Sequence, residues 1–153
     1  VTALNFGAED YTADIGAIRT KDGTELADLR ARMLLAARVA GVQALDSVYS
    51  DVADDDGLYE ESRRARILGF DGKSVIHPRQ IPVVHRAFTP SEKEIAAALR
   101  VERGLAEGKR MGVGVVVVDG KMVDAPVLKR ARKVLELARA AGALPKEEES
   151  SCR

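Results

Sequence analysis

The stretch that decides the fold is residues 25–49, ELADLRARMLLAARVAGVQALDSVY. Its first part has apolar side chains three or four residues apart, which predicts one buried face of a helix over about residues 25–40. These apolar positions are Leu26, Leu29, Met33, Ala37 and Ala40. Gly41 suits the position after a helix, where a left-handed backbone is common. The run from Ala44 to Tyr49 is strand-like, so the stretch predicts a helix that leads into a buried strand.

The same alternation of strand and helix extends to both sides of this stretch. Upstream, residues 3–6 predict a short buried strand and residues 8–23 a loop. Downstream, the sequence predicts a loop over residues 50–56, a helix over 58–68, a strand over 73–76 and a short helix over 80–86. A strand–helix unit repeated about every 30 residues is typical of an α/β fold with a parallel sheet.

Polar side chains lie at the ends of all three predicted strands. Glu9 and Asp10 follow the first strand, Asp46 and Asp51 accompany the second, and His77 follows the third. In parallel α/β folds the carboxyl ends of the strands meet at one edge, and functional sites lie there. We therefore expect a functional site at this edge.

The pattern changes after Phe88. Ser91 and Glu94 predict a capping box at the start of a helix that extends to about residue 107. Two apolar runs then flank Asp119-Gly120, which is a strong hairpin signal, and a last helix follows Asp124.

These patterns divide the chain into three parts. Residues 1–88 are βα units, residues 89–145 are an extension of helix, hairpin and helix, and residues 146–153 are a disordered, solvated tail.

The composition excludes several classes of protein. Of the 153 residues, 46% are hydrophobic and 31% charged, as in an ordinary globular domain. The 24 Lys and Arg balance the 24 Asp and Glu, which gives no electrostatic case for a nucleic acid or a membrane as partner. No membrane span or secretion signal is visible, so we expect a cytoplasmic protein. The single cysteine, Cys152, excludes a disulfide within the chain.

Five ordered blocks carry a more specific signal. They are GAEDYTADIG (7–16), ALDSVYSDV (44–52), GFDGKSVIHPRQI (69–81), FTPSEKEI (88–95) and DGKMVDAPVLKRA (119–131). Together they resemble the citrate lyase beta subunit family, within the HpcH/HpaI aldolase superfamily, over about residues 1–142. The wider family includes stand-alone malyl-CoA and citramalyl-CoA lyases.

This resemblance implies the C-terminal part of a (β/α)8 barrel of the TIM type, about strands 6 to 8, followed by a C-terminal extension. A complete barrel takes about 250 residues, which is about 100 more than this chain has. The chain opens with Val1 and enters its first strand almost at once. We therefore expect an upstream half to be missing and this chain to be inactive alone.

The resemblance also implies a lyase that cleaves citryl-thioester to oxaloacetate and acetyl-thioester. Asp10 matches a family ligand of Mg²⁺, a cation that prefers oxygen ligands. Asp124 matches an aspartate that acts as acid and base across a subunit interface. The family's second carboxylate ligand, a glutamate, and its substrate-binding arginine come from strands absent here. The residues expected to bind the thioester are Gly7, Asp46, Ile76, His77 and Pro78.

The implied partners are an acyl carrier protein or CoA that bears the thioester, further copies of the chain in a trimer or hexamer, and the alpha and gamma subunits of citrate lyase. A stand-alone malyl-CoA or citramalyl-CoA lyase is the alternative within the family. A non-catalytic half-barrel that binds another chain is an alternative of a different class.

The residues themselves leave other roles open. Asp10 and Asp124 both suit helix caps or loops, and an Asp before Ala-Pro is an ordinary N-cap. Asp46 shares its strand face with Ala44 and Val48, so a buried charge there needs a partner and could form a structural ion pair. His77, at a strand end before Pro78, suits a hydrogen-bonded structural residue as well as a ligand contact.

Overall fold

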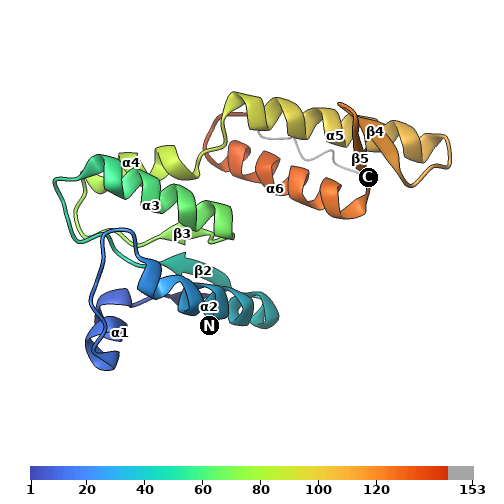
Figure 1. Cartoon of the computed structure of the whole chain (residues 1–153). Helices are drawn as coiled ribbons and strands as arrows, with labels where there is room; N and C mark the ends of the chain where they lie inside the picture. Colours follow the sequence, from blue (N-terminus) through green and yellow to red (C-terminus); the bar gives the residue numbers. More distant parts are fainter. Residues whose placement is uncertain (145–153) are drawn as a thin grey trace. The chain divides into compact units, whose positions relative to one another are not determined.

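The computed structural model describes residues 1–144. These residues form two compact units, of which the first is Val1–Phe88 and the second begins at Thr89. The first unit has the α/β architecture expected from the sequence (Figure 1). Its elements are β1 (Ala3–Asn5), α1 (Ala8–Ile15), the 3-10 helix η1 (Thr24–Leu26), α2 (Ala27–Ala40), β2 (Gln43–Asp46), α3 (Asp55–Leu68), β3 (Gly72–Lys73) and α4 (Gln80–Phe88). The tail predicted over residues 146–153 lies outside the described residues.

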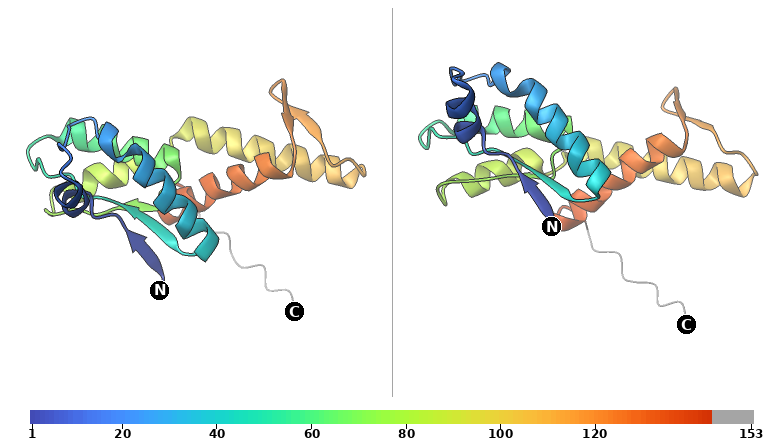
Figure 2. Two further views of the ribbon diagram at one scale, coloured as in Figure 1. Left: turned by 60° about the horizontal axis from the view of Figure 1, so that its bottom comes forward. Right: turned by 90° about the horizontal axis from the view of Figure 1, so that it is seen from below.

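The strands of the first unit form one parallel sheet in the order β1-β2-β3 (Figure 2). Leu4 pairs with Ala44, and Leu45 pairs with Gly72. Helix α2 connects β1 to β2, and α3 connects β2 to β3, because parallel neighbours require a crossover connection. The parallel α/β sheet predicted from the strand–helix rhythm is confirmed.

Helices α2 and α3 cover one face of this sheet. Leu4 and Ala44 point to that face and pack in one hydrophobic cluster with Ala37 of α2 and Ala65 of α3. The three alanines are almost completely buried, so small side chains let the helices approach the sheet closely. Because side chains alternate along a strand, Leu45 points to the opposite face, where it is only partly buried.

Residues 8–23 do not form the predicted loop, because they begin with helix α1. The helix is short: Gly16 adopts the left-handed conformation at φ 68° and closes it. Only Ala8 and Thr12, one turn apart, are buried, and the rest of the helix is polar or partly exposed. Two buried positions give too weak an apolar periodicity to reveal a helix in the sequence.

Strands β2 and β3 both end three residues earlier than predicted. The Ser74 N–H, just after β3, still donates to the Asp46 carbonyl of β2 at 3.0 Å, but other backbone groups beyond the strands bond to side chains. The Ser47 carbonyl accepts a hydrogen bond from Lys73 Nζ at 2.7 Å, and the Ile76 N–H donates to Gln80 Oε1 at 3.0 Å. Apart from the Ser74 bond, these contacts with side chains take the place of strand pairing.

The second unit consists of α5 (Glu92–Arg110), β4 (Val116–Val118), β5 (Lys121–Val123) and α6 (Ala125–Ala140). The predicted capping box is present, because the side chains of Ser91 and Glu94 each accept a hydrogen bond from the other's backbone N–H. The predicted hairpin is present too. Asp119 and Gly120 adopt φ values of 50° and 73°, as the tight turns of two-residue hairpins require.

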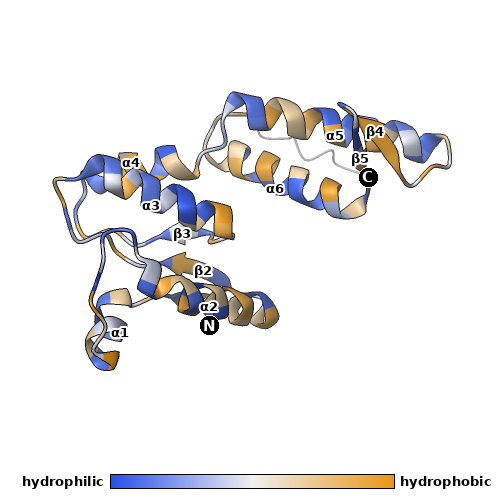
Figure 3. Ribbon diagram, viewed as in Figure 1, coloured by the Kyte–Doolittle hydropathy of each residue, from blue (hydrophilic) through white to orange (hydrophobic). Residues whose placement is uncertain are grey.

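Helices α5 and α6 pack against each other through five buried apolar residues: Ile95, Ala98, Ala131, Leu135 and Ala138. Strand β4, which appears orange in Figure 3, lies against α5 through Val116 and Val118, while Val117 is exposed. A Cβ atom on Gly108 would stand 2.3 Å from Val116 Cγ1, so this close approach requires glycine. Among the helices that the structure describes, none is long and apolar enough to cross a membrane.

Candidate active site

Asp10 lies just beyond the carboxyl end of β1, in the first turn of α1. The chain leaves the strand through buried Phe6 and then Gly7, which precedes the helix. The Asp10 carboxylate folds back over this glycine, because a Cβ atom on Gly7 would stand 3.3 Å from Asp10 Oδ2. Asp10 therefore stands at the sheet edge where the sequence predicts a site, and the positive end of the helix dipole favours its charge.

The Asp10 side chain is available to a cation. It is exposed, and it makes no hydrogen bond or ion pair with any residue that the structure describes. Magnesium usually takes one or two protein carboxylates and completes its shell with water and substrate, so Asp10 fits as one ligand. Within residues 1–144, no group of three or more His, Cys, Asp or Glu side chains is arranged to hold a metal, so further ligands would come from elsewhere.

Asp46 is completely buried at the end of β2, on the face that α2 and α3 cover. Arg30 of α2 binds both of its carboxylate oxygens, with Nε 2.8 Å from Oδ1 and Nη2 3.1 Å from Oδ2. Lys73 Nζ also donates to Oδ2, at 3.1 Å. Of the two roles left open for Asp46, the structure shows the ion pair. Its role in thioester binding stays a prediction.

Lys73 extends this cluster to Glu61 of α3. Its Nζ donates to Glu61 Oε1, and both side chains have at most 1% of their surface exposed. Neither Arg30 nor Glu61 stands out in the sequence as a functional residue. The signal that could have revealed Glu61 is its spacing from Leu58 and Ala65, which places a charge on the apolar face of α3.

Arg19 connects the buried cluster to α1 and η1. It contacts the carboxylates of Glu9, Glu25 and Glu61 at 3.1, 2.8 and 3.6 Å. Burial alone would lower the pKa of Arg19, but these carboxylates raise it above the usual arginine value. Burial likewise disfavours the charge of Glu25, yet hydrogen bonds from Thr20 and Arg19 lower its pKa to about 2. Glu9 is thus engaged by Arg19, in contrast to its neighbour Asp10.

The predicted thioester-binding residues Ile76, His77 and Pro78 follow β3. Just before them, Ser74 Oγ donates to Asn5 Oδ1 at 2.8 Å, so the segment after β3 starts beside the end of β1. Ile76 is half exposed. His77 is exposed, and its Nδ1 accepts a hydrogen bond from the Arg79 N–H at 3.2 Å. This local bond supports a structural role for His77, while the thioester contacts stay predictions.

Asp124, in the second unit, is the N-cap of α6. Its Oδ1 accepts a hydrogen bond from the Val127 N–H at 3.1 Å. The capping role is therefore confirmed. The other carboxylate oxygen has no hydrogen-bond partner among the described residues, so the cap leaves an oxygen for proton transfer. The acid/base role of Asp124 stays a prediction.

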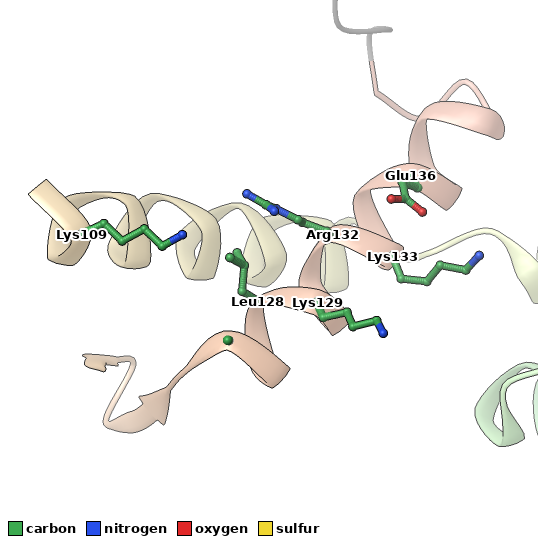
Figure 4. Close-up of a pocket in the computed structure, with 7 residues that line it drawn as sticks. Lys109, Leu128, Lys129, Arg132, Lys133 and Glu136 are labelled. Atoms are coloured by element: carbon green, nitrogen blue, oxygen red, sulfur yellow. The ribbon is translucent and has the colours of Figure 1, made fainter. Parts of the chain in front are cut away.

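A pocket of about 410 Å³ opens beside the first turns of α6 (Figure 4). Lys109 of α5 reaches toward Leu128 and Arg132 of α6 in this view. Four of the seven lining residues are cationic: Lys109, Lys129, Arg132 and Lys133. Residues 125–140 as a whole carry five Lys and Arg against one Glu. Such a concentration of one charge sign attracts anions.

The chain is similar to enzymes of one family. Residues 1–78 match the family HpcH/HpaI aldolase/citrate lyase. Over 139 residues the chain is 47% identical to citrate lyase subunit beta of Escherichia coli, which covers 91% of this chain and 46% of that protein. Over 136 residues it is 41% identical to the mitochondrial citramalyl-CoA lyase of Rattus norvegicus, with 89% and 40% covered.

A solved structure shows the same likeness in three dimensions. The CitE protein of Mycobacterium tuberculosis, in complex with magnesium, acetoacetate and coenzyme A, superposes with a TM-score of 0.73 at 40% identity. The superposition covers 89% of this chain and 51% of CitE. This chain thus spans about half the length of the relatives it matches.

Proposed function

This chain belongs to the HpcH/HpaI aldolase/citrate lyase family, and from this we propose that it carries part of the active site of a magnesium-dependent carbon–carbon lyase. The substrate we propose is a citryl-thioester, which is cleaved to oxaloacetate and acetyl-thioester, as the likeness to citrate lyase subunit beta suggests. A lyase for citramalyl-CoA or malyl-CoA is the second candidate, which the 41% identity to a citramalyl-CoA lyase favours.

The observation that carries this proposal is the unpaired carboxylate of Asp10 at the carboxyl end of β1. An exposed carboxylate over a glycine, with no partner among the described residues, is ready to bind a cation. Magnesium bound there would polarise the oxygen that becomes the ketone of the leaving oxo-acid. Asp10 would hold the cation, and the segment Ile76-His77-Pro78 would lie along the thioester.

We also propose that residues 1–88 are the last three βα units of a (β/α)8 barrel, about strands 6 to 8, with the C-terminal extension beginning at Thr89. The parallel order β1-β2-β3 supports this arrangement, as do the two helices on one face of the sheet. Leu45, on the other face, would then point into the barrel interior. The remaining strands would supply the second carboxylate ligand and the substrate-binding arginine.

For Asp124 we propose the role of acid that protonates the enolate of the acetyl-thioester, acting in the site of a neighbouring copy. Its position at the start of α6 supports this role, because one carboxylate oxygen serves the cap and the other is left for proton transfer. The protein would then be a homo-oligomer, a trimer or hexamer. Whether alpha and gamma citrate lyase subunits join it depends on which thioester is used.

The basic pocket beside Asp124 suits a thioester carrier that bears phosphate. Ala125, the residue after Asp124, is part of its lining together with Lys109 and Arg132. Coenzyme A and the prosthetic group of an acyl carrier protein both carry phosphate on a pantetheine arm. Substituting Lys109 and Arg132 by Glu should raise the KM for the carrier and abolish its dependence on salt concentration.

Asp10→Ala in the complete enzyme, with the upstream half supplied, tests the metal role. We expect loss of Mg²⁺-dependent cleavage and of Mg²⁺ binding in calorimetry, with an unchanged circular dichroism spectrum. Asp14→Ala is a matched control, because Asp14 is an exposed carboxylate of the same helix. Full turnover of Asp10→Ala with magnesium as the only divalent ion would contradict the assignment.

The 153-residue chain alone is expected to have no lyase activity, because the second ligand and the substrate-binding arginine are proposed to come from other strands. Adding the upstream half should restore cleavage. Robust cleavage of citryl-thioester by the pure chain would contradict the division of the site between two halves. A complete enzyme that binds other chains but cleaves none of the three thioesters would favour the non-catalytic module.

A further inference from the structure

Arg19 lies among three carboxylates that come from three different elements. Its Nε donates to Glu9 Oε1 of α1 at 3.1 Å, and its Nη1 donates to Glu25 Oε1 of η1 at 2.8 Å. Its Nη2 stands 3.6 Å from Glu61 Oε2 of α3. Because a guanidinium presents its donors in fixed directions, these three contacts constrain how α1, η1 and α3 are oriented to one another.

Glu61 gives this arrangement a rigid anchor. Its Oε1 accepts a hydrogen bond from buried Lys73, which in turn bonds to Asp46 at the end of β2. Its Oε2 has no hydrogen bond among the described residues and faces Arg19 at 3.6 Å and Arg30 at 3.5 Å. A continuous path of charged contacts therefore leads from the sheet to Arg19 and onward to Glu9.

Helix α1 has little other support. Only Ala8 and Thr12 are buried in it, and Ala8 and Tyr11 join a small apolar cluster with Phe6, Leu26 and two partly buried residues of α2, Leu29 and Met33. Such a small apolar contact does little to prevent an eight-residue helix from turning about its axis.

Glu9 and Asp10 are adjacent on α1, so their side chains leave the helix in directions about 100° apart. The bond between Glu9 and Arg19 therefore sets the rotation of α1, and the direction of Asp10 with it. We propose that Arg19 is a positioning residue, which holds α1 so that Asp10 faces the carboxyl edge of the sheet. This inference rests on the proposed function, since it takes Asp10 as the magnesium ligand.

Arg19→Gln in the complete enzyme tests the proposal, because glutamine keeps much of the volume and removes the charge and the fork of donors. We expect the dissociation constant for Mg²⁺, measured by calorimetry without substrate, to rise about 10- to 100-fold, as for other residues that orient a metal ligand. Amide hydrogen exchange in residues 8–15 should become faster in the metal-free protein. Arg19→Lys keeps the charge and one contact and should recover part of the affinity.

The control is Arg32→Gln, because Arg32 is an arginine paired with one carboxylate, Asp28, on the exposed side of α2. It should change neither the metal affinity nor the exchange in α1. If Arg19→Gln lowers the melting temperature but leaves Mg²⁺ affinity and α1 exchange as in the wild type, Arg19 is merely structural and the proposal is overturned.

Asp10→Ala separates this inference from the proposed function. Loss of Mg²⁺ binding in Asp10→Ala together with wild-type binding in Arg19→Gln overturns the positioning role alone. If Asp10→Ala binds Mg²⁺ as tightly as the wild type, the assignment of Asp10 as a metal ligand is overturned. The positioning role of Arg19 is then overturned too, whatever the hydrogen exchange of α1 shows.

Discussion

Replacing Lys73 by Met should destabilise the protein strongly. Lys73 Nζ is completely buried and donates to Asp46 Oδ2 at 3.1 Å, to the Ser47 carbonyl at 2.7 Å and to Glu61. Methionine nearly keeps the length and volume of lysine but leaves the two carboxylates without this cation. Removing one partner of a buried ion pair costs about 3–5 kcal/mol. We expect a loss of this size, out of the roughly 5–15 kcal/mol typical of folded domains.

The loss is measured as the free energy of unfolding in urea, followed by circular dichroism at pH 7. Lys21→Met is the matched control, because Lys21 pairs with Asp54 at 2.6 Å while 76% of its side chain is exposed. Such a solvated pair should contribute nothing measurable. Lys73→Met combined with Glu61→Gln should recover part of the loss, because it removes the carboxylate whose Oε1 has lost its hydrogen-bond donor.

A clear result against this reasoning would be equal, small effects of Lys73→Met and Lys21→Met. The buried carboxylates would then be solvated or protonated at little cost, and the cluster would add little to stability. Losses of stability in Lys73→Met and Glu61→Gln that simply add in the double variant would likewise show that these two side chains are not coupled.

Three further results are expected. In the complete enzyme, Asp124→Asn should lower turnover about 100-fold or more at a nearly unchanged melting temperature. Mixing the Asp124→Asn enzyme with the Asp10→Ala enzyme should restore part of the activity. No recovery despite proven subunit exchange contradicts a role of Asp124 in trans. The Cβ atom of Gly108→Ala would stand 2.3 Å from Val116 Cγ1, so this variant should lower the free energy of unfolding in urea by about 1–3 kcal/mol. Wild-type stability of the variant would contradict the close packing of β4 on α5. The folded-state pKa of Glu25 is lowered from 4.5 to about 2, so the stability that its charge contributes is present above pH 4.5 and is lost as pH falls through 2. The stability difference between wild type and Glu25→Gln should therefore shrink steadily from pH 5 to pH 2. A difference that is as large at pH 2 as at pH 5 contradicts an electrostatic origin.

The sheet could be predicted because its signal is local. Apolar spacing and Gly41 predict the last residue of α2 and place its start within two residues, and the strand that follows begins one residue from the predicted start. The hairpin and both helices of the second unit follow from Asp119-Gly120, the capping box and the Asp124 cap in the same way. In each case the residues that decide the element lie within a few positions of it.

Helix α1 could not be predicted in this way. Its sequence AEDYTADI offers two buried positions, and the helix depends on contacts with Phe6 and Leu26 outside its own span. The family resemblance singled out Asp10, but the exposure of its carboxylate and its approach to Gly7 follow only from the helix that carries it.

The partners of Asp46 illustrate the same limit. Alternation with Ala44 correctly placed its charge among buried residues and required a partner. Arg30 lies 16 residues before Asp46 and Lys73 lies 27 residues after it, so no local pattern joins them. Arg30 and Glu61 lie on the apolar faces of α2 and α3, and a buried charge on a helix needs a partner of opposite charge in the core. These two positions were the only hint in the sequence that Asp46 has charged partners.

The buried charges raise the question of why a helix–sheet interface contains them. Well-packed apolar residues in place of a buried ion pair are often as stabilising, so stability alone does not account for Arg30, Asp46, Glu61 and Lys73. Their continuation through Arg19 supplies a second reason. An apolar interface would hold α2 and α3 to the sheet, but it would offer Arg19 no buried carboxylate. Helix α1 would then be held to the sheet only by the chain through Gly7 and by its apolar contact with Phe6 and Leu26. On this reasoning the charged cluster fixes α1, the helix that carries Asp10, relative to the sheet.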